Sequence, residues 1–292
     1  MEMRARARSM LAGVTKLSKN RLGLAGSIVI GCFVGVAILA PYLAPYGAMH
    51  KSFNERGELE SLQKPSARHW FGTTMQGRDV FSQVIYGTRV ALLVGVLDAL
   101  LTGFLGTLVG IAAGYSRGRV DDFLMRFVDI LYSIPFEPFA IAVLCILGPS
   151  LWRLIAIIAL LLWRDPARVI RAQTLTLSQR PYVKSARASG ASDLRIMWVH
   201  IAPNVLPLTF AYMALGAGWA IIAEASISFL GFGDPGVMSW GTILNHVFVN
   251  GQIGNAWWWS FPPGAMIVLL VLSIFVTFRA YEEEFNPRLR RW

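Results

Sequence analysis

Four acidic residues lie inside otherwise apolar stretches of this sequence: Asp98, Asp129, Glu137 and Glu224. An ionised side chain inside a membrane is costly, so such residues usually face a cavity or a charged partner. Asp98, Glu137 and Glu224 are therefore candidates for lining a polar pathway between helices. Asp129 lies three residues after Arg126, and we expect these two side chains to pair along one helix face.

Each candidate also has a structural alternative. Glu137 stands between Pro135 and Pro138, where a helix is expected to break, and it can point into a pathway or simply shape the break. Asp98 can face a partner chain. Glu224 precedes a glycine-rich segment, where it can accept backbone hydrogen bonds.

No set of residues indicates an enzyme. The histidines are scattered along the chain, and the two cysteines lie far apart in apolar segments. We therefore expect neither catalytic residues nor a metal site. The phosphate-binding pattern Gly-x-x-x-x-Gly-Lys-Ser/Thr is absent, and no lysine follows a glycine. The chain is thus not expected to bind nucleotide phosphates in a P-loop.

The composition around these groups is that of a membrane protein. Of the 292 residues, 55% are hydrophobic and only 15% are charged. The net charge of +10 could suggest a nucleic-acid partner, but the basic residues lie between long apolar runs rather than on one polar face. Nucleic-acid binding is therefore excluded, and lipid is the expected surrounding.

Six stretches approach the roughly 20 apolar residues that a membrane-spanning helix needs. They predict an all-α polytopic protein with six transmembrane helices. The fourth is short and is expected to extend through Ile170, where long basic side chains can reach the interface. The six stretches are residues 22–42, 90–115, 123–147, 151–163, 203–230 and 262–281.

Basic residues set the orientation, because Lys and Arg in short loops stay on the cytoplasmic side. Cytoplasmic termini place 19 of the 27 basic residues inside and 6 outside. Trp257, Trp258, Trp259 and Phe261 then fall at the outer interface, where we expect an aromatic anchor. The predicted organisation begins with a basic cytoplasmic segment (1–21), a first helix (22–44) and a periplasmic loop with an interfacial helix (45–89). A five-helix core (90–281) follows, and it includes a cytoplasmic segment (171–203) and a periplasmic loop (231–261). The chain is expected to end in a cytoplasmic tail (282–292).

The periplasmic loop is too long to be a simple turn. Gly72 and Gly77 permit tight turns, and Asp79 can cap a following helix. The apolar residues after Asp79 suit the membrane interface. The loop is therefore expected either to dock on a partner or to form a folded lid over helix ends.

The cytoplasmic segment predicts a helix, a turn and a second helix. Pro181 suits a first helical turn, and Gly190 can take the left-handed conformation that ends a helix. Ser192 can cap a second short helix, which should stop before Pro203. Small side chains and Lys184, Arg187 and Arg195 offer a surface to an acidic partner, although local physics alone also permits an amphipathic loop at the membrane.

The residues of this segment resemble a known family. The run Tyr182-Val183-Lys184-Ser185-Ala186-Arg187-Ala188-Ser189-Gly190-Ala191-Ser192-Asp193, followed by Ile201-Ala202-Pro203-Asn204, is similar to the EAA loop of bacterial ABC importer permeases of the dipeptide, oligopeptide and nickel family. Further matches are Gly72-Thr73 with Gly77-Arg78-Asp79, Glu224 to Gly233 with Ser239-Trp240-Gly241-Thr242, and Asn286-Pro287-Arg288-Leu289-Arg290. The chain resembles the second permease subunit, the DppC or OppC type. The family's usual Glu-Ala-Ala is Lys184-Ser185-Ala186 here.

The resemblance implies a type I ABC importer permease in the bacterial inner membrane. Its partners would be a second permease subunit of the DppB or OppB type, two ATPase subunits that bind ATP and Mg²⁺, and a periplasmic or lipid-anchored binding protein. No cofactor would be bound by this chain itself. The resemblance also implies that the ATPase is contacted by Tyr182, Val183, Lys184, Ala186, Arg187, Gly190, Ala191, Ser192 and Asp193.

Peptides are the substrates that the resemblance favours, and related permeases also move oligosaccharides or nickel. An alternative of another class is an ion-coupled secondary transporter, which would need ion-binding polar residues in broken helices at the membrane centre. Six spans with one charged cytoplasmic helix-turn-helix fit that alternative poorly.

Overall fold

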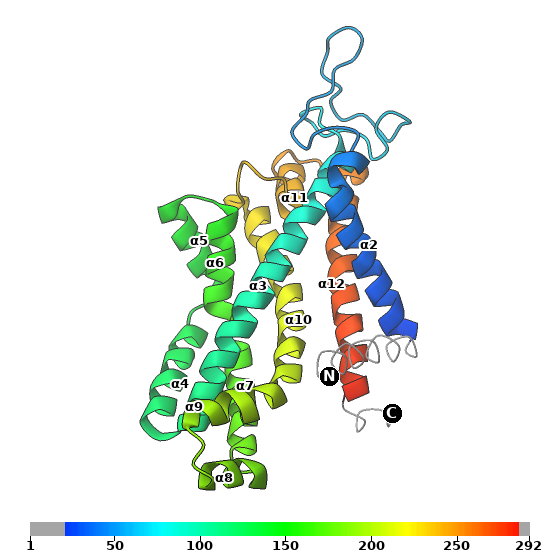
Figure 1. The fold of residues 1–292 in the computed structure, drawn as a ribbon. Helices are drawn as coiled ribbons and strands as arrows, with labels where there is room; N and C mark the ends of the chain where they lie inside the picture. The colour runs from blue at the N-terminus through cyan, green and yellow to red at the C-terminus, as the bar shows by residue number, and fades with distance from the viewer. Residues whose placement is uncertain (1–20, 286–292) are drawn as a thin grey trace. The chain divides into compact units, whose positions relative to one another are not determined.

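The computed structural model describes residues 21–285, and these form helices joined by loops (Figure 1). The predicted basic N-terminal segment and nearly all of the predicted tail lie outside the described residues. The elements are α2 (Arg21–Leu43), α3 (Val80–Ser116), α4 (Gly118–Ser133), α5 (Phe136–Leu147), α6 (Leu151–Leu162), α7 (Arg164–Leu177), α8 (Pro181–Ala188), α9 (Asp193–Arg195), η1 (Ile196–Ile201), α10 (Ala202–Ile227), η2 (Ser228–Phe232), α11 (Trp240–Val249) and α12 (Trp257–Phe285).

Within the described residues, the structure supports fewer membrane spans than the six predicted. Four helical segments are long and apolar enough, at residues 21–43, 80–116, 193–232 and 257–281. A fifth span is possible as the pair α4 and α5, which meet at 83°. The predicted fourth span forms α6, whose 12 residues are too short alone, and the chain continues directly into α7. The break before Glu137 is confirmed, since Pro135 has extended backbone geometry between α4 and α5.

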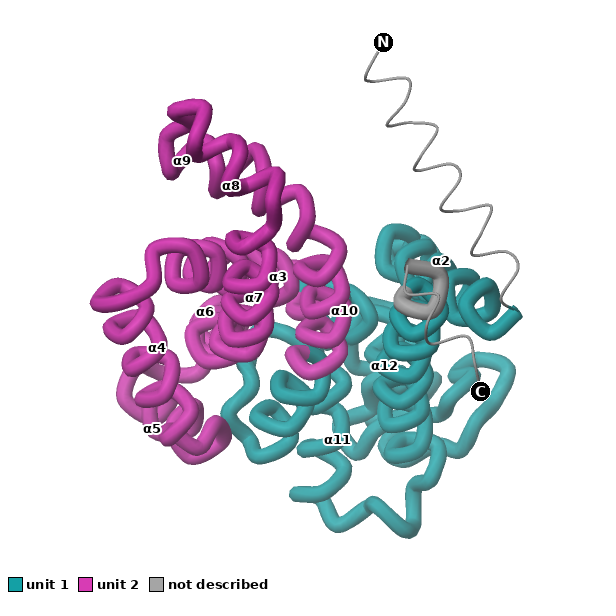
Figure 2. The backbone as a smooth tube through the Cα atoms, turned by 90° about the horizontal axis from the view of Figure 1, so that it is seen from below, with its two compact units in different colours: residues 1–93, 221–292 teal, residues 94–220 magenta. Residues whose placement is uncertain are grey.

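The chain divides into two compact units, which Figure 2 shows in teal and magenta. Unit 1 comprises residues 1–93 and 221–292, and unit 2 comprises residues 94–220. The long helices α3 and α10 each contribute to both units. In α3, residues 80–89 form the first turns of this helix instead of the separate interfacial helix that was predicted, because no proline interrupts the run.

A stripe of glycines on α3 organises unit 2. Gly106, Gly110 and Gly114 recur every four residues and therefore lie on one helix face. A methyl group built on Gly110 would lie 2.8 Å from the carbonyl oxygen of Ala167 on α7, and methyl groups on the other two glycines would meet α7 similarly. Small residues let two spanning helices approach this closely. The glycine stripe therefore seats α7 directly against α3.

A hydroxyl pair joins α3 to α10 in the same unit. The Oγ1 atoms of Thr107 and Thr209 lie 2.8 Å apart in a buried position. One turn away, a methyl group on Gly103 would collide with the side chain of Met213, at 2.3 Å. α3 is thus the helix onto which both α7 and α10 pack in unit 2.

Tryptophans form much of the core of unit 1. Trp240 is buried, and its indole nitrogen donates a hydrogen bond of 3.0 Å to the carbonyl of Val84. Trp258 and Trp259 are only 6% and 0% exposed. The prediction of an anchor made from three tryptophans was therefore wrong for these two. Only Trp257 and Phe261 of that group are exposed, because α12 turns its second and third tryptophans towards the core.

The loop between α2 and α3, which was predicted to be periplasmic, is folded on itself, and this agrees with the lid alternative. Gly72 and Gly77 both have positive φ angles, as the predicted turns require. Gly72 also lies against Trp258, since a methyl group there would meet the indole ring at 2.7 Å. The Trp258 indole donates a hydrogen bond to the carbonyl of Thr73, at 3.4 Å. We refer to residues 44–79 as the lid.

A buried histidine connects two carboxylates inside the lid. His69 Nδ1 lies 2.8 Å from Asp79 and its Nε2 lies 3.1 Å from Glu60. The other oxygen of Asp79 accepts a hydrogen bond from the backbone N–H of Ser82, at 2.7 Å. Asp79 therefore caps α3, as predicted, and ties that helix end to the lid.

Candidate functional site

The segment that was predicted to be cytoplasmic has the predicted helix and turn. Pro181 occupies the first turn of α8, and Gly190 has a φ of +82°, which ends the helix. The Ser192 hydroxyl accepts a hydrogen bond from the backbone N–H of Arg195 and caps α9. We call residues 181–193 the coupling segment.

The second helix differs from the prediction because it does not stop before Pro203. α9 passes into the π-helix η1 and then into α10 without a break. Pro203 therefore lies inside a continuous helix, directly after the π-helical turns of η1, where the regular α-helical hydrogen-bond pattern is already altered. The described chain therefore runs continuously from Asp193 into a membrane-spanning helix.

Three residues of the coupling segment hold it to unit 2. Val183 is only 1% exposed and belongs to the core cluster formed by Ile111, Ile170 and other apolar residues. Ala186 and Ala191 are partly buried against the same cluster. These three were predicted as contacts to an ATPase, and in the structure they also pack the segment against its own chain.

The remaining predicted contacts of the coupling segment are exposed. They are Tyr182, Lys184, Arg187, Gly190, Ser192 and Asp193. Leu194 is 66% exposed and extends the same surface, although sequence reasoning had not selected it. The available signal in the sequence was an apolar residue placed between two charged ones, Asp193 and Arg195. The segment thus offers small, apolar and basic groups together to solvent.

Tyr115, at the end of α3, makes polar contacts with the coupling segment. Its hydroxyl donates a hydrogen bond of 2.5 Å to Asp193. The guanidinium carbon of Arg187 lies 5.3 Å from the centre of the Tyr115 ring. The hydrogen bond and charge interaction with Tyr115 raise the pKa of the Arg187 guanidinium above its ordinary value. Arg187 and Asp193, which lie on either side of the Gly190 turn, therefore both contact α3 through Tyr115.

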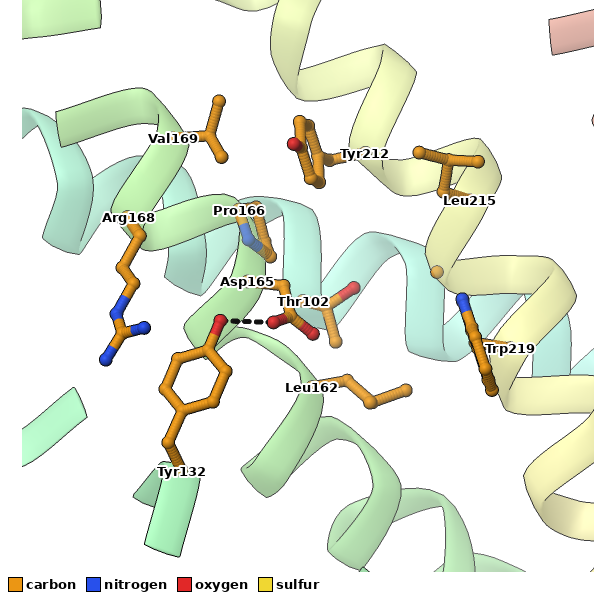
Figure 3. A pocket seen from close by; sticks show the side chains of 11 residues that line it. Thr102, Tyr132, Leu162, Asp165, Pro166, Arg168, Val169, Tyr212, Leu215 and Trp219 are labelled. Carbon is orange, nitrogen blue, oxygen red and sulfur yellow. Dashed lines mark hydrogen bonds between the residues drawn. The ribbon is translucent and has the colours of Figure 1, made fainter. Parts of the chain in front are cut away.

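A second feature of unit 2 is a cavity of about 500 Å³ (Figure 3). It is bounded by side chains of α3, α4, α7 and α10, together with Leu162 at the end of α6. Three of its lining residues are the aromatic side chains Tyr132, Tyr212 and Trp219. The full lining is Thr102, Tyr132, Leu162, Asp165, Pro166, Arg168, Val169, Tyr212, Leu215, Gly216 and Trp219.

The charged side chains that line the cavity already have partners. The Tyr132 hydroxyl donates a hydrogen bond to Asp165. Arg168 lies over the ring of Tyr132, with its guanidinium carbon 3.8 Å from the ring centre, and forms an ion pair with Asp129. The prediction that Asp129 pairs with Arg126 was therefore wrong, because α7 brings a closer cation to the carboxylate.

The three predicted pathway residues do not form one site. Glu137 is exposed at the start of α5. Glu224 is buried in unit 1 and accepts a hydrogen bond of 2.6 Å from the hydroxyl of Ser228, not from the backbone. Asp98 is fully buried in the chain, so it does not face a partner. Of the three, Asp98 lies nearest the cavity, beside Gly216.

Sequence reasoning missed the cavity residues. Asp165 and Arg168 follow the apolar run of α6 and flank Pro166, and this interruption of a span by charges was the available signal. Tyr132, Tyr212 and Trp219 carry no such signal, since aromatic residues are frequent throughout membrane helices.

Comparisons with known proteins agree with this arrangement. Residues 106–291 match the model of the binding-protein-dependent transport system inner membrane component. Residues 12–65 match the N-terminal transmembrane domain of oligopeptide transport permease C. Similar in fold is a chain from the MetNI methionine ABC transporter in an inward-facing form, with a TM-score of 0.54 and 19% identity over 68% of this chain and 95% of that one.

Curated relatives cover almost the whole chain. The dipeptide transport permease DppC of Bacillus subtilis is 34% identical over 94% of this chain and 85% of its own length. The glutathione transport permease GsiD of Pectobacterium atrosepticum is 32% identical over 93% and 89%. The oligopeptide transport permease OppC of Bacillus subtilis is 30% identical over 94% and 88%.

Fold and sequence together define a helical permease of the bacterial inner membrane. The chain belongs to the family of binding-protein-dependent transport system inner membrane components, that is, the permease subunits of ABC importers. The family that the sequence motifs indicated is thereby confirmed.

Proposed function

We propose that this chain forms half of the translocation pathway of an ATP-driven importer of di- or oligopeptides. A second permease subunit would form the other half, and a binding protein would deliver the substrate. The names of the similar permeases, which carry dipeptides, oligopeptides and glutathione, support peptides over oligosaccharides or nickel.

The observation that carries the proposal is the exposed coupling segment. Val183 packs the segment against its own chain, while Tyr182, Arg187 and the adjacent Leu194 are exposed to solvent. Exposed apolar side chains beside a positive charge are suited to a protein groove with an acidic rim. Two ATPase subunits would bind and hydrolyse ATP with Mg²⁺, and one would receive this segment, since the present sequence has no P-loop pattern.

Energy would reach the pathway through the helices of unit 2. The Tyr115 contacts join the coupling segment to α3, and α3 in turn packs on α7 and α10 around the cavity. A displacement of the segment by the ATPase would therefore bias α3 and its neighbours between two arrangements, which is how a bound partner shifts a conformational equilibrium.

The substitution Gly190→Asp tests the docking surface. A side chain at Gly190 meets no atom of its own chain within 4 Å, so the larger residue would project only towards a partner. Gly57→Asp is a matched control, because Gly57 also has a positive φ and open surroundings but lies in the lid. We expect Gly190→Asp to lose co-purification with the ATPase subunits while Gly57→Asp retains it. Equal retention by both variants would contradict the docking role.

A further inference from the structure

Asp98 is a fully buried carboxylate without a hydrogen-bond partner. Its exposure is 0%, and neither carboxylate oxygen has a polar partner in the described part of the chain. It lies in α3, a helix long and apolar enough to span the membrane. An unpaired carboxylate is costly in such surroundings and is by default a sign of function.

The side chain lies directly behind the wall of the cavity. Thr102, one turn along α3, and Gly216 on α10 both line the cavity. A methyl group built on Gly216 would lie 3.4 Å from the Thr102 hydroxyl and 3.8 Å from Asp98 Oδ2. Because Gly216 has no side chain, there is no Cβ atom at this position of the cavity wall, next to the carboxylate of Asp98.

The Thr102 hydroxyl does not donate a hydrogen bond to the side-chain carboxylate of Asp98. Its hydroxyl donates a hydrogen bond of 2.8 Å to the backbone carbonyl of Asp98 and a longer one to that of Ala99. The hydroxyl proton is therefore used by the backbone. Both oxygens of the Asp98 side chain remain available as acceptors.

The other charged side chains at the cavity already have polar partners. Asp165 accepts from Tyr132, and Arg168 is paired with Asp129 and stacked on the Tyr132 ring. Asp98 is thus a buried carboxyl group with no polar partner among the described residues, next to a cavity lined by three aromatic side chains. Such surroundings favour a cationic group, which gains from both the carboxylate and the ring faces.

We propose that Asp98 receives the primary ammonium group of the substrate as it passes the cavity, with Thr102 and Gly216 flanking the approach. This inference rests on the proposed function, because a free amino terminus is the positive group that unmodified peptides share whatever their side chains. Contact with one such group would be strong enough to admit the substrate and weak enough to release it.

The test compares two substrates in the complete importer, reconstituted in liposomes with its ATPase subunits and binding protein. Alanyl-alanine carries the ammonium group, and lactoyl-alanine has a hydroxyl group in its place. Each is supplied at the concentration that gives equal occupancy of the binding protein, measured separately by calorimetry. The ratio of the two uptake rates then reports recognition by the permease.

The wild-type complex should transport alanyl-alanine at least about tenfold faster than lactoyl-alanine, as expected for loss of one charged hydrogen bond. Asp98→Asn should bring the two rates together by slowing alanyl-alanine, with ATPase activity retained. Its melting temperature should be unchanged or higher, because an unpaired buried charge is removed. Gly216→Ala should lower the ratio partly, whereas Gly264→Ala, in open space on α12, should leave it unchanged.

A wild-type ratio near one, or an unchanged ratio in Asp98→Asn, would overturn the inference. If Asp98→Asn fails to fold, the Gly216→Ala variant decides, and an unchanged ratio there would also overturn it. Failure of the wild-type complex to import either substrate with ATP would instead contradict the proposed function.

Discussion

The Tyr115 hydroxyl donates a hydrogen bond to the carboxylate of Asp193, which lies three residues after the Gly190 turn. The contact joins the end of a membrane-spanning helix to the segment that we propose as the ATPase contact. Because Arg187 also lies over the Tyr115 ring, one side chain contacts both sides of the turn. Tyr115 is therefore well placed to relay movement of the segment to α3.

Removing this hydroxyl should weaken coupling more than folding. Tyr115→Phe keeps the ring under Arg187 but loses the hydrogen bond, which is worth about 1 kcal/mol of stability. We expect fewer peptides imported per ATP hydrolysed, measured in liposomes, and a melting temperature lowered by only a few degrees. Tyr42→Phe is the control, since Tyr42 is 88% exposed. An unchanged ratio of transport to hydrolysis in Tyr115→Phe would argue against the relay.

The contact between α3 and α7 should not tolerate a methyl group. Gly110→Ala would place its Cβ 2.8 Å from both a backbone oxygen and the Cβ of Ile170. Such overpacking costs about 1–3 kcal/mol, because the backbone itself must move. A lower melting temperature in detergent is expected. Gly35→Ala, with no atom within 4 Å, should match the wild type, and equal melting temperatures for both variants would contradict the packing described for unit 2.

The lid should open when Asp79 is replaced. Asp79→Ala removes the cap of α3, worth about 1 kcal/mol, and leaves His69 Nδ1 buried without its carboxylate. Trypsin should then cut faster after Lys51 and Arg68 in the lid, as followed by mass spectrometry. Glu55→Ala, an exposed change in the same loop, is the control. Equal cleavage rates in the two variants would show that Asp79 does not hold the lid.

Acid should destabilise unit 1 through His246. Burial, and then the nearby positive charge of Arg78, lower the pKa of this histidine below its ordinary value. The folded state therefore favours the neutral ring. The stability this provides is present above the ordinary value of about 6.5 and is lost as the pH falls towards the lower folded pKa. His246→Gln should reduce the loss of melting temperature between about pH 7.5 and pH 5, and an identical loss would rule out this contribution.

Local features of this sequence were predictable, and their long-range partners were not. Pro181, Gly190 and Ser192 act through their own backbone, so their positions in the coupling segment followed from residue type. The burial of Val183 depends on residues of four other elements, including Ile111 on α3 and Ile170 on α7. A single sequence without structure does not reveal that such residues are neighbours.

The same limit applied to the charged residues. Asp129 has Arg126 near it in sequence, but the helix break at Pro135 and the packing of α7 bring Arg168 to it instead. Asp98 was recognised as unusual because a carboxylate stands in an apolar run. Its position next to Gly216 depends on how α3 and α10 pack against each other, which the sequence alone does not show.

Dipeptide accumulation in liposomes that contain the complete importer tests ATP-driven import most directly. ATP is supplied on the ATPase side, and an ionophore removes all ion gradients. Accumulation should require both ATP and the loaded binding protein, continue with the ionophore, and be lost in Gly190→Asp. Accumulation that proceeds without ATP and collapses with the ionophore would show an ion-coupled transporter and contradict the account.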